Sequence, residues 1–333
     1  MNLVTGATGL LGSHIAEKLR QADQPVRALV RDSSDTRFLE SIGVELARGD
    51  LNDADSIKQA TRDVEVVYHS AAKVGDWGPW EQFQEYTIDG TQHILDAAAD
   101  AGVRRLVHIS SISAYGHPDG KNLTIDETCP IGQNLYRWAY YTKAKVEAER
   151  RVRRMFEEKN LPITIIRPSW IYGQRDRTSI ARIVDSIRTG KQKIIGKGDN
   201  RLNTVYAGNV ADGCLLSADS DKAVGEAYNL SNDGVITQEQ YFNTYAECLG
   251  CPPIQRHVPF WLAYSAAFDL EVLGHLFRKK KPPFITRYAV WLIGRQVYYS
   301  TEKAQSELGW RSRVSYDDGI RQTVQWYLDR EKE

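Results

Sequence analysis

TGATGLLG at residues 5–12 follows the short apolar run Leu3-Val4 and precedes a segment, 14–19, whose apolar residues have helical spacing. This pattern predicts a strand, a tight glycine turn and the start of a helix. Glycines at 6, 9 and 12 would let the backbone approach a pyrophosphate closely, and the free N–H groups at the helix start would favour its negative charge. The stretch therefore predicts a dinucleotide-binding fold.

Strand-like and helical segments alternate through the first half of the chain. Further apolar runs lie at 26–30, 44–48, 65–69 and 105–109, with helical patterns such as 53–62 and 89–101 between them. Strict alternation predicts an α/β fold with a doubly wound parallel sheet of the Rossmann type, whose ligands bind at the carboxyl ends of the strands.

The second strand ends at the position that distinguishes the two nicotinamide cofactors in dinucleotide folds. An acidic residue there binds a free ribose 2′-hydroxyl, whereas an arginine accommodates a 2′-phosphate. The run at 26–30 is followed by Arg31, so we expect NADP(H) to be preferred. Asp32 stands beside it and could take the acidic role, which leaves NAD(H) as the alternative.

The composition argues against several classes of protein. The chain has 43 basic and 43 acidic side chains, which cancel, so it offers no basic footprint for nucleic acid. The cysteines, at 129, 214, 248 and 251, include one Cys-x-x-Cys pair but no second pair, so we expect free thiols and no metal site. Because the sequence begins directly with a strand, we expect no signal peptide and a cytoplasmic location.

A tyrosine and a lysine, Tyr141 and Lys145, are spaced one helical turn apart. A free tyrosine has a pKa of about 10 and exchanges protons poorly at neutral pH unless a nearby cation stabilises its phenolate. Lys145 would lie on the same helix face and supply that charge. Tyr136 and Tyr140 have no lysine one turn later, so Tyr141 is the consistent candidate. Taken alone, the pair would better suit an ordinary surface helix.

Six segments together resemble the extended short-chain dehydrogenase/reductase superfamily, which includes NAD-dependent epimerases and dehydratases. They are TGATGLLGSH at 5–14, Gly49-Asp50, HSAA at 69–72, ISSISAYG at 109–116, YYTKAK at 140–145 and RPSWIYG at 167–173. The resemblance covers nearly the whole chain. It implies hydride transfer at a nicotinamide, with Tyr141 as acid or base, Lys145 beside it and Ser111 orienting the substrate oxygen. Ser110 is the alternative for that serine.

The resemblance also implies which residues bind the cofactor. Besides Arg31 and Asp32 they are Gly6, Thr8, Gly9, Leu10, Leu11, Gly12, Asp50, Leu51, Ala71, Ala72, Lys73, Ser110, Tyr141, Lys145, Pro168, Ser169 and Ile171. One position departs from the family pattern, because Thr87 stands where many members have an asparagine. This departure puts an asparagine-based member of the proton relay in doubt.

Mostly aromatic side chains flank the catalytic segments, and we expect some of them to bind the substrate. The candidates are Trp77, Trp80, Ile112, Tyr136, Trp170 and Tyr172. Aromatic walls with few charges suit an apolar substrate better than a sugar diphosphate. The alternative is that these rings only pack loops against the core.

Finer cues within the superfamily concern the substrate. The tryptophan loop at 74–80, the aromatic C-terminal segment and Asn209, where epimerases usually carry an aspartate, most resemble the 3β-hydroxysteroid dehydrogenase-like branch. That branch includes sterol-carboxylate dehydrogenases and 2-alkyl-3-oxoalkanoate reductases, with dihydroflavonol reductases nearby. The likeness implies a bulky, largely apolar 3-oxo or 3-hydroxy compound such as a steroid or an oxoalkanoate.

The family's organisation implies two domains that interleave in sequence. We expect a dinucleotide-binding domain from 1–168 with 203–231, and a smaller, mostly helical substrate domain from 169–202 with 232–333. A homodimer is the default expectation, because family members often pair through the two helices that flank the sheet.

The stretch 259–277 is rich in Phe, Trp, Leu and Ala and is followed by the basic run 278–281. Asp269 and Glu271 interrupt it, so it does not predict a membrane span. Such a segment can lie on an anionic membrane surface. We favour the alternative, in which it covers the substrate or packs within the small domain and the basic run is simply solvated.

Together these features predict an NADP-preferring oxidoreductase that interconverts an apolar secondary alcohol and ketone. A nucleotide-sugar epimerase or dehydratase on the same fold is the leading alternative, and its diphosphate could bind to Arg175, Arg177, Lys197 and Arg201. An alternative of another class is a non-catalytic NAD(P)-binding regulatory protein. Such relatives usually lose the tyrosine and the lysine, and both are present here.

Overall fold

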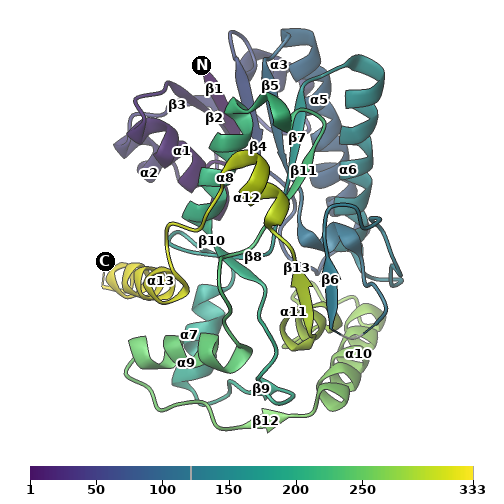
Figure 1. The fold of residues 1–333 in the computed structure, drawn as a ribbon, viewed down its shortest axis with the longest axis vertical. Coiled ribbons are helices and arrows are strands. Elements are labelled where there is room, and N and C mark those ends of the chain that lie inside the picture. Colours follow the sequence, from purple (N-terminus) through teal and green to yellow (C-terminus); the bar gives the residue numbers. More distant parts are fainter. Residues whose placement is uncertain (121, 333) are drawn as a thin grey trace.

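The computed structural model describes residues 1–120 and 122–332, and its centre is a seven-stranded parallel sheet (Figure 1). The strands follow the order β11-β7-β5-β4-β1-β2-β3. Their bounds are β1 Asn2–Thr5, β2 Val26–Val30, β3 Glu45–Arg48, β4 Val66–His69, β5 Arg105–Ile109, β7 Ile163–Pro168 and β11 Ala227–Leu230. The order reverses beside β1, so the carboxyl ends of β1 and β4 form the switch point at which ligands bind in such sheets.

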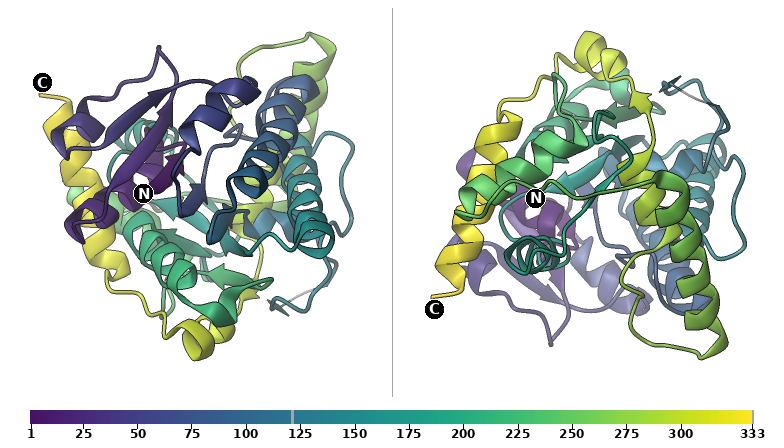
Figure 2. Two further views of the ribbon diagram at one scale, coloured as in Figure 1. Left: turned by 90° about the horizontal axis from the view of Figure 1, so that it is seen from above. Right: turned by 90° about the horizontal axis from the view of Figure 1, so that it is seen from below.

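Helices cover both faces of the sheet (Figures 1 and 2). One side holds α1 (Leu10–Gln21), α2 (Arg37–Ser41), α8 (Ala207–Asp219) and α12 (Glu302–Leu308), and the other holds α3 (Ala54–Ala60), α5 (Gly90–Ala101) and α6 (Tyr140–Lys159). The inner strands β1, β4 and β5 are buried on both faces, and for this reason they are mostly apolar runs in the sequence. The predicted doubly wound α/β fold is confirmed.

The remaining elements build a second region below the carboxyl ends of the sheet in Figure 1. Three short parallel strand pairs belong here: β8 (Trp170–Tyr172) with β10 (Thr204–Tyr206), β9 (Ile194–Ile195) with β12 (His257–Val258), and β6 (Leu123–Ile125) with β13 (Val297–Tyr299). The longer helices are α7 (Ile180–Arg188), α9 (Gln238–Cys248), α10 (Phe260–Leu276), α11 (Arg287–Gly294) and α13 (Tyr316–Arg330). Shorter turns are α4 (Trp80–Phe83), η1 (Gln84–Asp89) and η2 (Ile112–Tyr115). A further short turn, η3 (Asp221–Ala223), lies outside this region, next to the amino end of β7.

The C-terminal segment contributes to both regions. Ala304, Leu308 and Trp310 pack in the core beneath α1 and α8, although the predicted boundary assigns 232–333 to the substrate domain. Asn209 holds this segment in place: its amide nitrogen donates to Val314 O at 2.8 Å, and its amide oxygen accepts from two backbone N–H groups nearby. A carboxylate could not donate, so asparagine suits this position better than aspartate.

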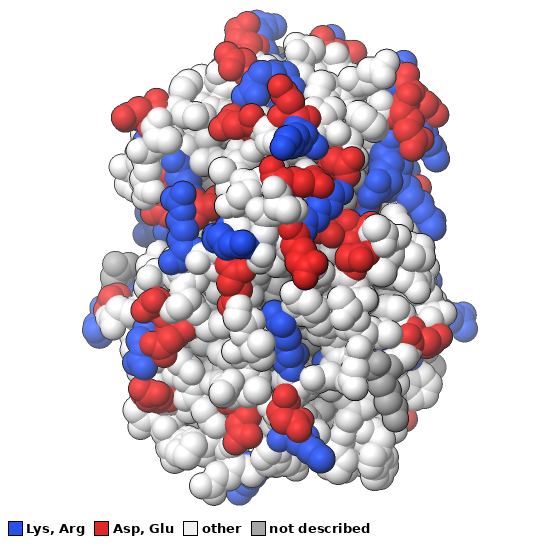
Figure 3. Space-filling view, in the orientation of Figure 1, with Lys and Arg blue, Asp and Glu red and all other residues white. Residues whose placement is uncertain are grey.

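The surface carries charges of both signs without a dominant patch in the view of Figure 3. Charged side chains are denser over the upper half, which holds the sheet, than over the lower half. Within residues 1–120 and 122–332, no helix is long and apolar enough to cross a membrane.

Candidate active site

The glycine turn between β1 and α1 leaves no room for side chains. Gly6 has φ +70°, which favours glycine, and its carbonyl oxygen accepts from Gly9 N at 2.9 Å. A Cβ on Gly12 would lie 2.2 Å from Gly6 O, so only glycine fits there. Among the described residues no side chain caps α1, whose N-cap is Gly9. The helix start is therefore open to an anion, as a dinucleotide pyrophosphate requires.

The segment after β4 is fixed against this turn by a buried hydrogen-bonded chain. Thr91 Oγ1 donates to Thr87 O, so His69 Nε2 donates to Thr91 Oγ1 at 3.0 Å and His69 Nδ1 accepts from Thr5 Oγ1 at 2.8 Å. Burial lowers the pKa of His69 to about 3, which keeps the ring neutral. Thr5 Oγ1 in turn accepts from Ala71 N. The sequence analysis did not single out this chain, although the histidine of the HSAA segment was its visible sign.

The three predicted cofactor residues after β4 are Ala71, Ala72 and Lys73, and they lie next to this hydrogen-bonded chain. A Cβ on Gly6 would lie 2.8 Å from Ala71 N, so the two strand ends are in close contact. Ala72 and Lys73 continue from there, and Lys73 N donates to Thr87 Oγ1 at 3.0 Å. The threonine that replaces the family's asparagine thus positions the cofactor-side backbone.

Four of the predicted cofactor residues follow the ends of β2 and β3. Arg31 and Asp32 are exposed, and Arg48 donates through Nη1 to Arg31 O at 3.3 Å. Asp50 accepts from Asn52 N, which holds the turn after β3, and Leu51 packs against the start of α5 at Gly90. Two arginine side chains therefore flank the edge of the sheet next to the glycine turn.

Tyr141 lies in the first turn of α6, where the structure brings it together with Ser111. Ser111 caps the 3-10 helix η2, and its Oγ accepts from Ser113 N at 3.1 Å. Burial raises the pKa of Tyr141, and the nearby hydroxyl groups of Ser111 and Ser113 act in the opposite direction. Ser113 is a second hydroxyl at this site that the sequence analysis did not single out.

Lys145 follows one turn later on α6 and is buried. Its Nζ donates to Ile109 O, at the end of β5, at 2.9 Å. Burial lowers the pKa of Lys145 to about 8, and the negative charge of Glu149 partly offsets this shift. The lysine is thus held at the carboxyl end of β5 with a pKa lowered to about 8.

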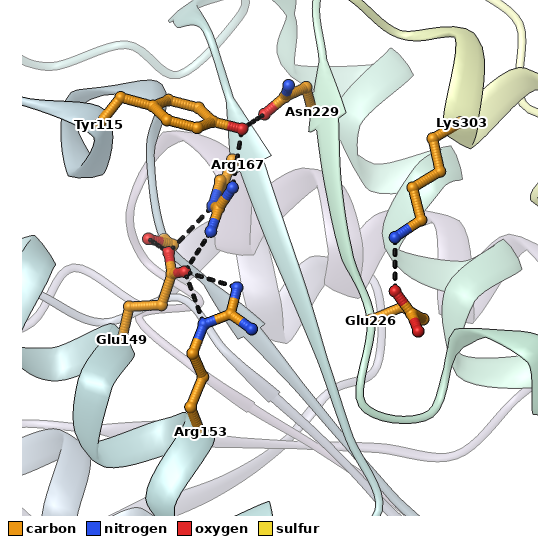
Figure 4. Close-up of polar contacts among 8 residues, drawn as sticks. Tyr115, Glu149, Arg153, Arg167, Glu226, Asn229 and Lys303 are labelled. Carbon is orange, nitrogen blue, oxygen red and sulfur yellow. Dashed lines mark hydrogen bonds and ion pairs between the residues drawn. The ribbon is translucent and has the colours of Figure 1, made fainter. Parts of the chain in front are cut away.

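Glu149, one further turn along α6, is the centre of a buried ionic network (Figure 4). It accepts two hydrogen bonds from Arg167 and one from Ser110 Oγ at 2.7 Å, and neither charged side chain is more than 1% exposed. Burial alone would raise the pKa of Glu149, but Arg167 lowers it below its usual range. The network positions Ser110 on Glu149, whereas Ser111 is the serine beside Tyr141.

Arg167 extends the network away from α6. Its Nη1 donates to Tyr115 Oη at 2.7 Å, and Tyr115 Oη donates to Asn229 Oδ1 at 2.9 Å, which links β7, η2 and β11 (Figure 4). Arg153 adds a half-exposed ion pair to Glu149 at 3.1 Å. The sequence analysis did not single out this network. Its only local sign was the spacing of Lys145 and Glu149.

The predicted cofactor residues at the end of β7 lie next to this network. Pro168 is the last residue of β7, Ser169 Oγ donates to Ser231 Oγ at 3.2 Å, and Ile171 is the middle residue of β8. At the first glycine turn, Thr8 and Leu10 are partly accessible, while Leu11 is buried against the core.

Aromatic rings surround the start of α6. Tyr288 of α11 meets the Tyr141 ring edge to face at 5.9 Å between centroids, and Trp80 contacts Tyr140 at 5.6 Å. Trp77 contacts His275 of α10 at 4.5 Å, and its Nε1 donates to Lys279 O at 3.0 Å. Tyr288 was not singled out from the sequence, because it is 147 positions after Tyr141 and only the fold brings the two together.

The remaining candidate substrate residues have different surroundings. Tyr136 stacks on His117 at 4.0 Å. Ile112 is buried in a cluster with Tyr115 and Tyr299, and Tyr172 is buried between Tyr206 and Tyr241. Trp170 also contacts Tyr241, at 5.6 Å, and is partly exposed. Ile112 and Tyr172 thus pack in cores, while Trp77 and Tyr136 lie in loops and Trp80 begins α4.

One acidic side chain lies among these rings. Asp76 accepts a hydrogen bond from Thr286, the N-cap of α11, and this contact joins the tryptophan loop to the second region. Burial raises the pKa of Asp76, and the Asp76 charge contributes to the raised pKa of Tyr141. The surroundings of Tyr141 on the side of these rings are therefore mainly aromatic, and they include the carboxyl group of Asp76.

Several known proteins resemble this chain in sequence. The model of the NAD dependent epimerase/dehydratase family matches residues 2–231. A 2-alkyl-3-oxoalkanoate reductase from Stenotrophomonas maltophilia (strain K279a) is 30% identical over 96% of this chain and 97% of its own length. The sterol-4-alpha-carboxylate 3-dehydrogenase, decarboxylating, of Mus musculus is 30% identical over 97% of this chain and 89% of its own.

Solved structures agree with the fold. The crystal structure of gox2253 has a TM-score of 0.82 and 30% identity, and the match covers 99% of this chain and 98% of that one. Solved nucleotide-sugar enzymes at 21% to 24% identity share the fold alone. The chain is thus an enzyme of the extended short-chain dehydrogenase/reductase superfamily, and it belongs to the NAD dependent epimerase/dehydratase family.

Proposed function

We propose that this enzyme interconverts a secondary alcohol and a ketone on a bulky, largely apolar substrate, with NADP(H) as the preferred cofactor. The observation that carries the proposal is the position of Tyr141, which has the hydroxyls of Ser111 and Ser113 on one side and the ring of Tyr288 on another. Such a site can protonate an oxygen atom while it holds an apolar carbon skeleton.

Tyr141 acts as the acid in ketone reduction. Its phenol O–H passes a proton to the substrate oxygen, while Ser111 donates a hydrogen bond to the same oxygen and shares its developing charge. Lys145, cationic below its pKa of about 8, stabilises the phenolate that remains on Tyr141. A nicotinamide cofactor, when bound, would supply the hydride. Alcohol oxidation uses the same groups in reverse.

The surroundings of Tyr141 support an apolar substrate over a sugar diphosphate. Two of the arginines that could hold a diphosphate have acidic partners: Arg175 pairs with Glu17, and Arg177 pairs with Asp35 at 3.4 Å. Arg201 donates to Gly234 O and lies over the Tyr298 ring. The rings of Trp77, Trp80, Tyr136 and Tyr288 instead offer apolar surface.

Arg31 supports the preference for NADP(H). It follows β2 at the edge where the adenine ribose lies in dinucleotide folds, and Arg48 lies beside it. We expect Arg31→Ser to lower kcat/KM for NADPH by about 10-fold with little change for NADH, because a phosphate contact of about 1.4 kcal/mol is lost. Equal kcat/KM values for the two cofactors in the unaltered enzyme would contradict the preference.

The function itself is tested by cofactor turnover with the purified enzyme. NADPH and NADH are each assayed against 3-oxosteroids, 2-alkyl-3-oxo acids, dihydroflavonols and UDP-sugars. NADPH oxidation that depends on an apolar ketone supports the proposal. Conversion of a UDP-sugar without net cofactor consumption would support the epimerase alternative instead.

We also propose a cytoplasmic homodimer that forms through α5 and α6, two of the helices on one side of the sheet. Light scattering of the purified protein tests the oligomeric state. A monomer would overturn the dimer and leave the chemistry of Tyr141 unaffected.

A further inference from the structure

The outer surface of α10 is unusually apolar. Of the eleven large apolar side chains that are exposed in the described residues, eight lie between 261 and 284. They are Trp261, Leu262, Phe268, Leu270, Leu273, Leu276, Phe277 and Phe284. Exposed apolar patches of this kind mark surfaces that bind a protein, a ligand or a membrane.

Only a narrow strip of α10 faces the protein. Ala263, Ala267 and Gly274 are buried, and so is Glu271, which pairs with Arg287 of α11 at 2.7 Å. The exposed part of the helix carries a single charge, Asp269. A helix that is apolar on nearly every side leaves apolar side chains in contact with water, which is unfavourable. An apolar environment on the outer side of α10 would therefore be more favourable than water.

A basic turn follows the helix directly. Arg278, Lys279, Lys280 and Lys281 are all exposed, and the sequence has no acidic residue between 272 and 301. The turn is built onto the helix end, since Lys279 N donates to Gly274 O at 2.8 Å and Trp77 Nε1 donates to Lys279 O. Four cations are thus held beside the exposed apolar side chains.

A surface hollow joins the two features. It has a volume of about 510 Å³ and is lined by Leu270, Leu273, Gly274, Phe284 and the turn 279–283. Its walls are apolar, with the lysines at one side. Figure 2 shows α10 and this turn at the edge of the molecule, on the side away from α13.

We propose that the outer face of α10 and the basic turn 278–281, together the α10 surface, bind the surface of an anionic phospholipid bilayer. The apolar side chains would enter the boundary between headgroups and acyl chains, and the four cations would contact lipid phosphates. A second copy of the chain is a poorer occupant, because a two-fold interface places the same patch on both subunits and would oppose two clusters of cations. This proposal replaces our preference from the sequence, since α10 packs against the protein through one strip only.

The α10 surface is connected to the proposed active site. On its inner side, His275 contacts the rings of Trp77, Trp138 and Tyr140, and Tyr140 precedes Tyr141. Bilayer binding would therefore bring the aromatic side of the site close to a lipid phase in which bulky apolar alcohols and ketones dissolve. This last step rests on the proposed function, whereas the bilayer binding does not.

The test is flotation of the full-length enzyme with phosphatidylcholine vesicles and with vesicles that also contain phosphatidylglycerol, without cofactor or substrate. We expect binding to the anionic vesicles at least about 10-fold stronger than to the neutral ones, and weaker binding at high salt. Equal, weak recovery with both vesicles would overturn the proposal. If the enzyme had no NADPH-dependent activity toward water-soluble ketones, this result would contradict the proposed function and would not affect the proposed bilayer binding.

Two variants and a matched control assign the binding to this surface. Lys279→Gln/Lys280→Gln/Lys281→Gln should lose the preference for anionic vesicles, and Leu276→Ser/Phe277→Ser should lose binding to both. The control Lys58→Gln/Arg62→Gln/Lys159→Gln removes the same charge from exposed positions elsewhere and should bind as the unaltered enzyme does. Equal losses in the control and the Lys279 variant would contradict the assignment. So would a Leu276/Phe277 variant that changes only the oligomeric state in light scattering.

Discussion

The two sides of Tyr141 are built by different means. On the cofactor side, buried polar groups are paired: Glu149 with Arg167 and Ser110, and His69 with Thr5 and Thr91. On the substrate side, aromatic rings from separate loops and helices meet, and their outermost helix, α10, leaves much apolar surface exposed. The contrast teaches that one side fixes the geometry of proton and cofactor, because unpaired buried charge is costly. The other side mainly excludes water and can vary with the substrate.

The largest effect is expected at the proposed proton donor, Tyr141. We expect Tyr141→Phe to lower kcat for ketone reduction by about 1,000-fold, because the variant keeps the ring and loses the proton donor. Tyr140→Phe is the matched control, since Tyr140 contacts Trp80 and His275 through its ring only, and it should retain near-normal kcat. Steady-state NADPH oxidation measures both. Near-normal turnover by Tyr141→Phe would rule out the mechanism.

The glycine turn gives the next largest effect. Gly12→Ala would place a Cβ 2.2 Å from Gly6 O, and the turn would have to shift. We expect cofactor affinity to fall by about 100-fold, which corresponds to about 2.7 kcal/mol. Gly9→Ala is a graded comparison, because its Cβ would lie at 3.2 Å from the same oxygen, and its loss should be smaller. Fluorescence titration with NADPH measures both, and unchanged affinity in Gly12→Ala would contradict the assigned cradle.

The buried network around Glu149 is expected to affect the pH dependence of kcat. Reduction needs cationic Lys145, whose pKa is about 8, so kcat should be constant at lower pH and fall as the pH rises through about 8. Glu149→Gln removes the negative charge that raises this pKa, so the fall should move to lower pH by about one unit. The same change leaves Arg167 buried without its partner and should cost about 3 kcal/mol of folding free energy.

Arg153→Gln is the control for that experiment, because Arg153 pairs with the same carboxylate from a half-exposed position. It should leave the pH profile unchanged and cost well under about 1 kcal/mol. Thermal melts and kcat profiles across pH separate the two effects. If Glu149→Gln lowers the melting temperature but leaves the pH profile of kcat unchanged, Glu149 stabilises the fold and does not raise the pKa of Lys145.

The smallest effect is expected on the substrate side. Gly274→Ala would put a Cβ 2.7 Å from the Trp77 ring and displace the tryptophan loop. If that loop contacts the substrate and not the reacting atoms, as proposed, KM for an apolar ketone should rise a few-fold with little change in kcat, at a stability cost of about 1 kcal/mol. A large fall in kcat with unchanged KM would mean that the loop acts on the chemistry instead.

The same contrast explains what could be predicted from the sequence. The glycine turn, Ser111 and the Tyr141/Lys145 pair depend on neighbours within one turn or one strand end, and the structure brings Ser111 and Tyr141 together as expected. The contacts of Arg167 with Glu149 and of Tyr288 with Tyr141 join elements that are far apart in the sequence. No local sequence pattern therefore predicted them. Ile112 and Tyr172 match the aromatic and apolar pattern of a substrate wall, but their positions beside Tyr115 and Tyr241 bury them in cores.

The measurement that tests the account most directly compares the unaltered enzyme with Tyr141→Phe in one assay, with NADPH and an apolar 3-oxo compound, and with UDP-glucose in parallel. The account predicts NADPH oxidation that depends on the ketone, is lost in Tyr141→Phe and is absent with UDP-glucose. Conversion of UDP-glucose by the unaltered enzyme, with no NADPH consumed in the presence of any apolar ketone, would contradict it.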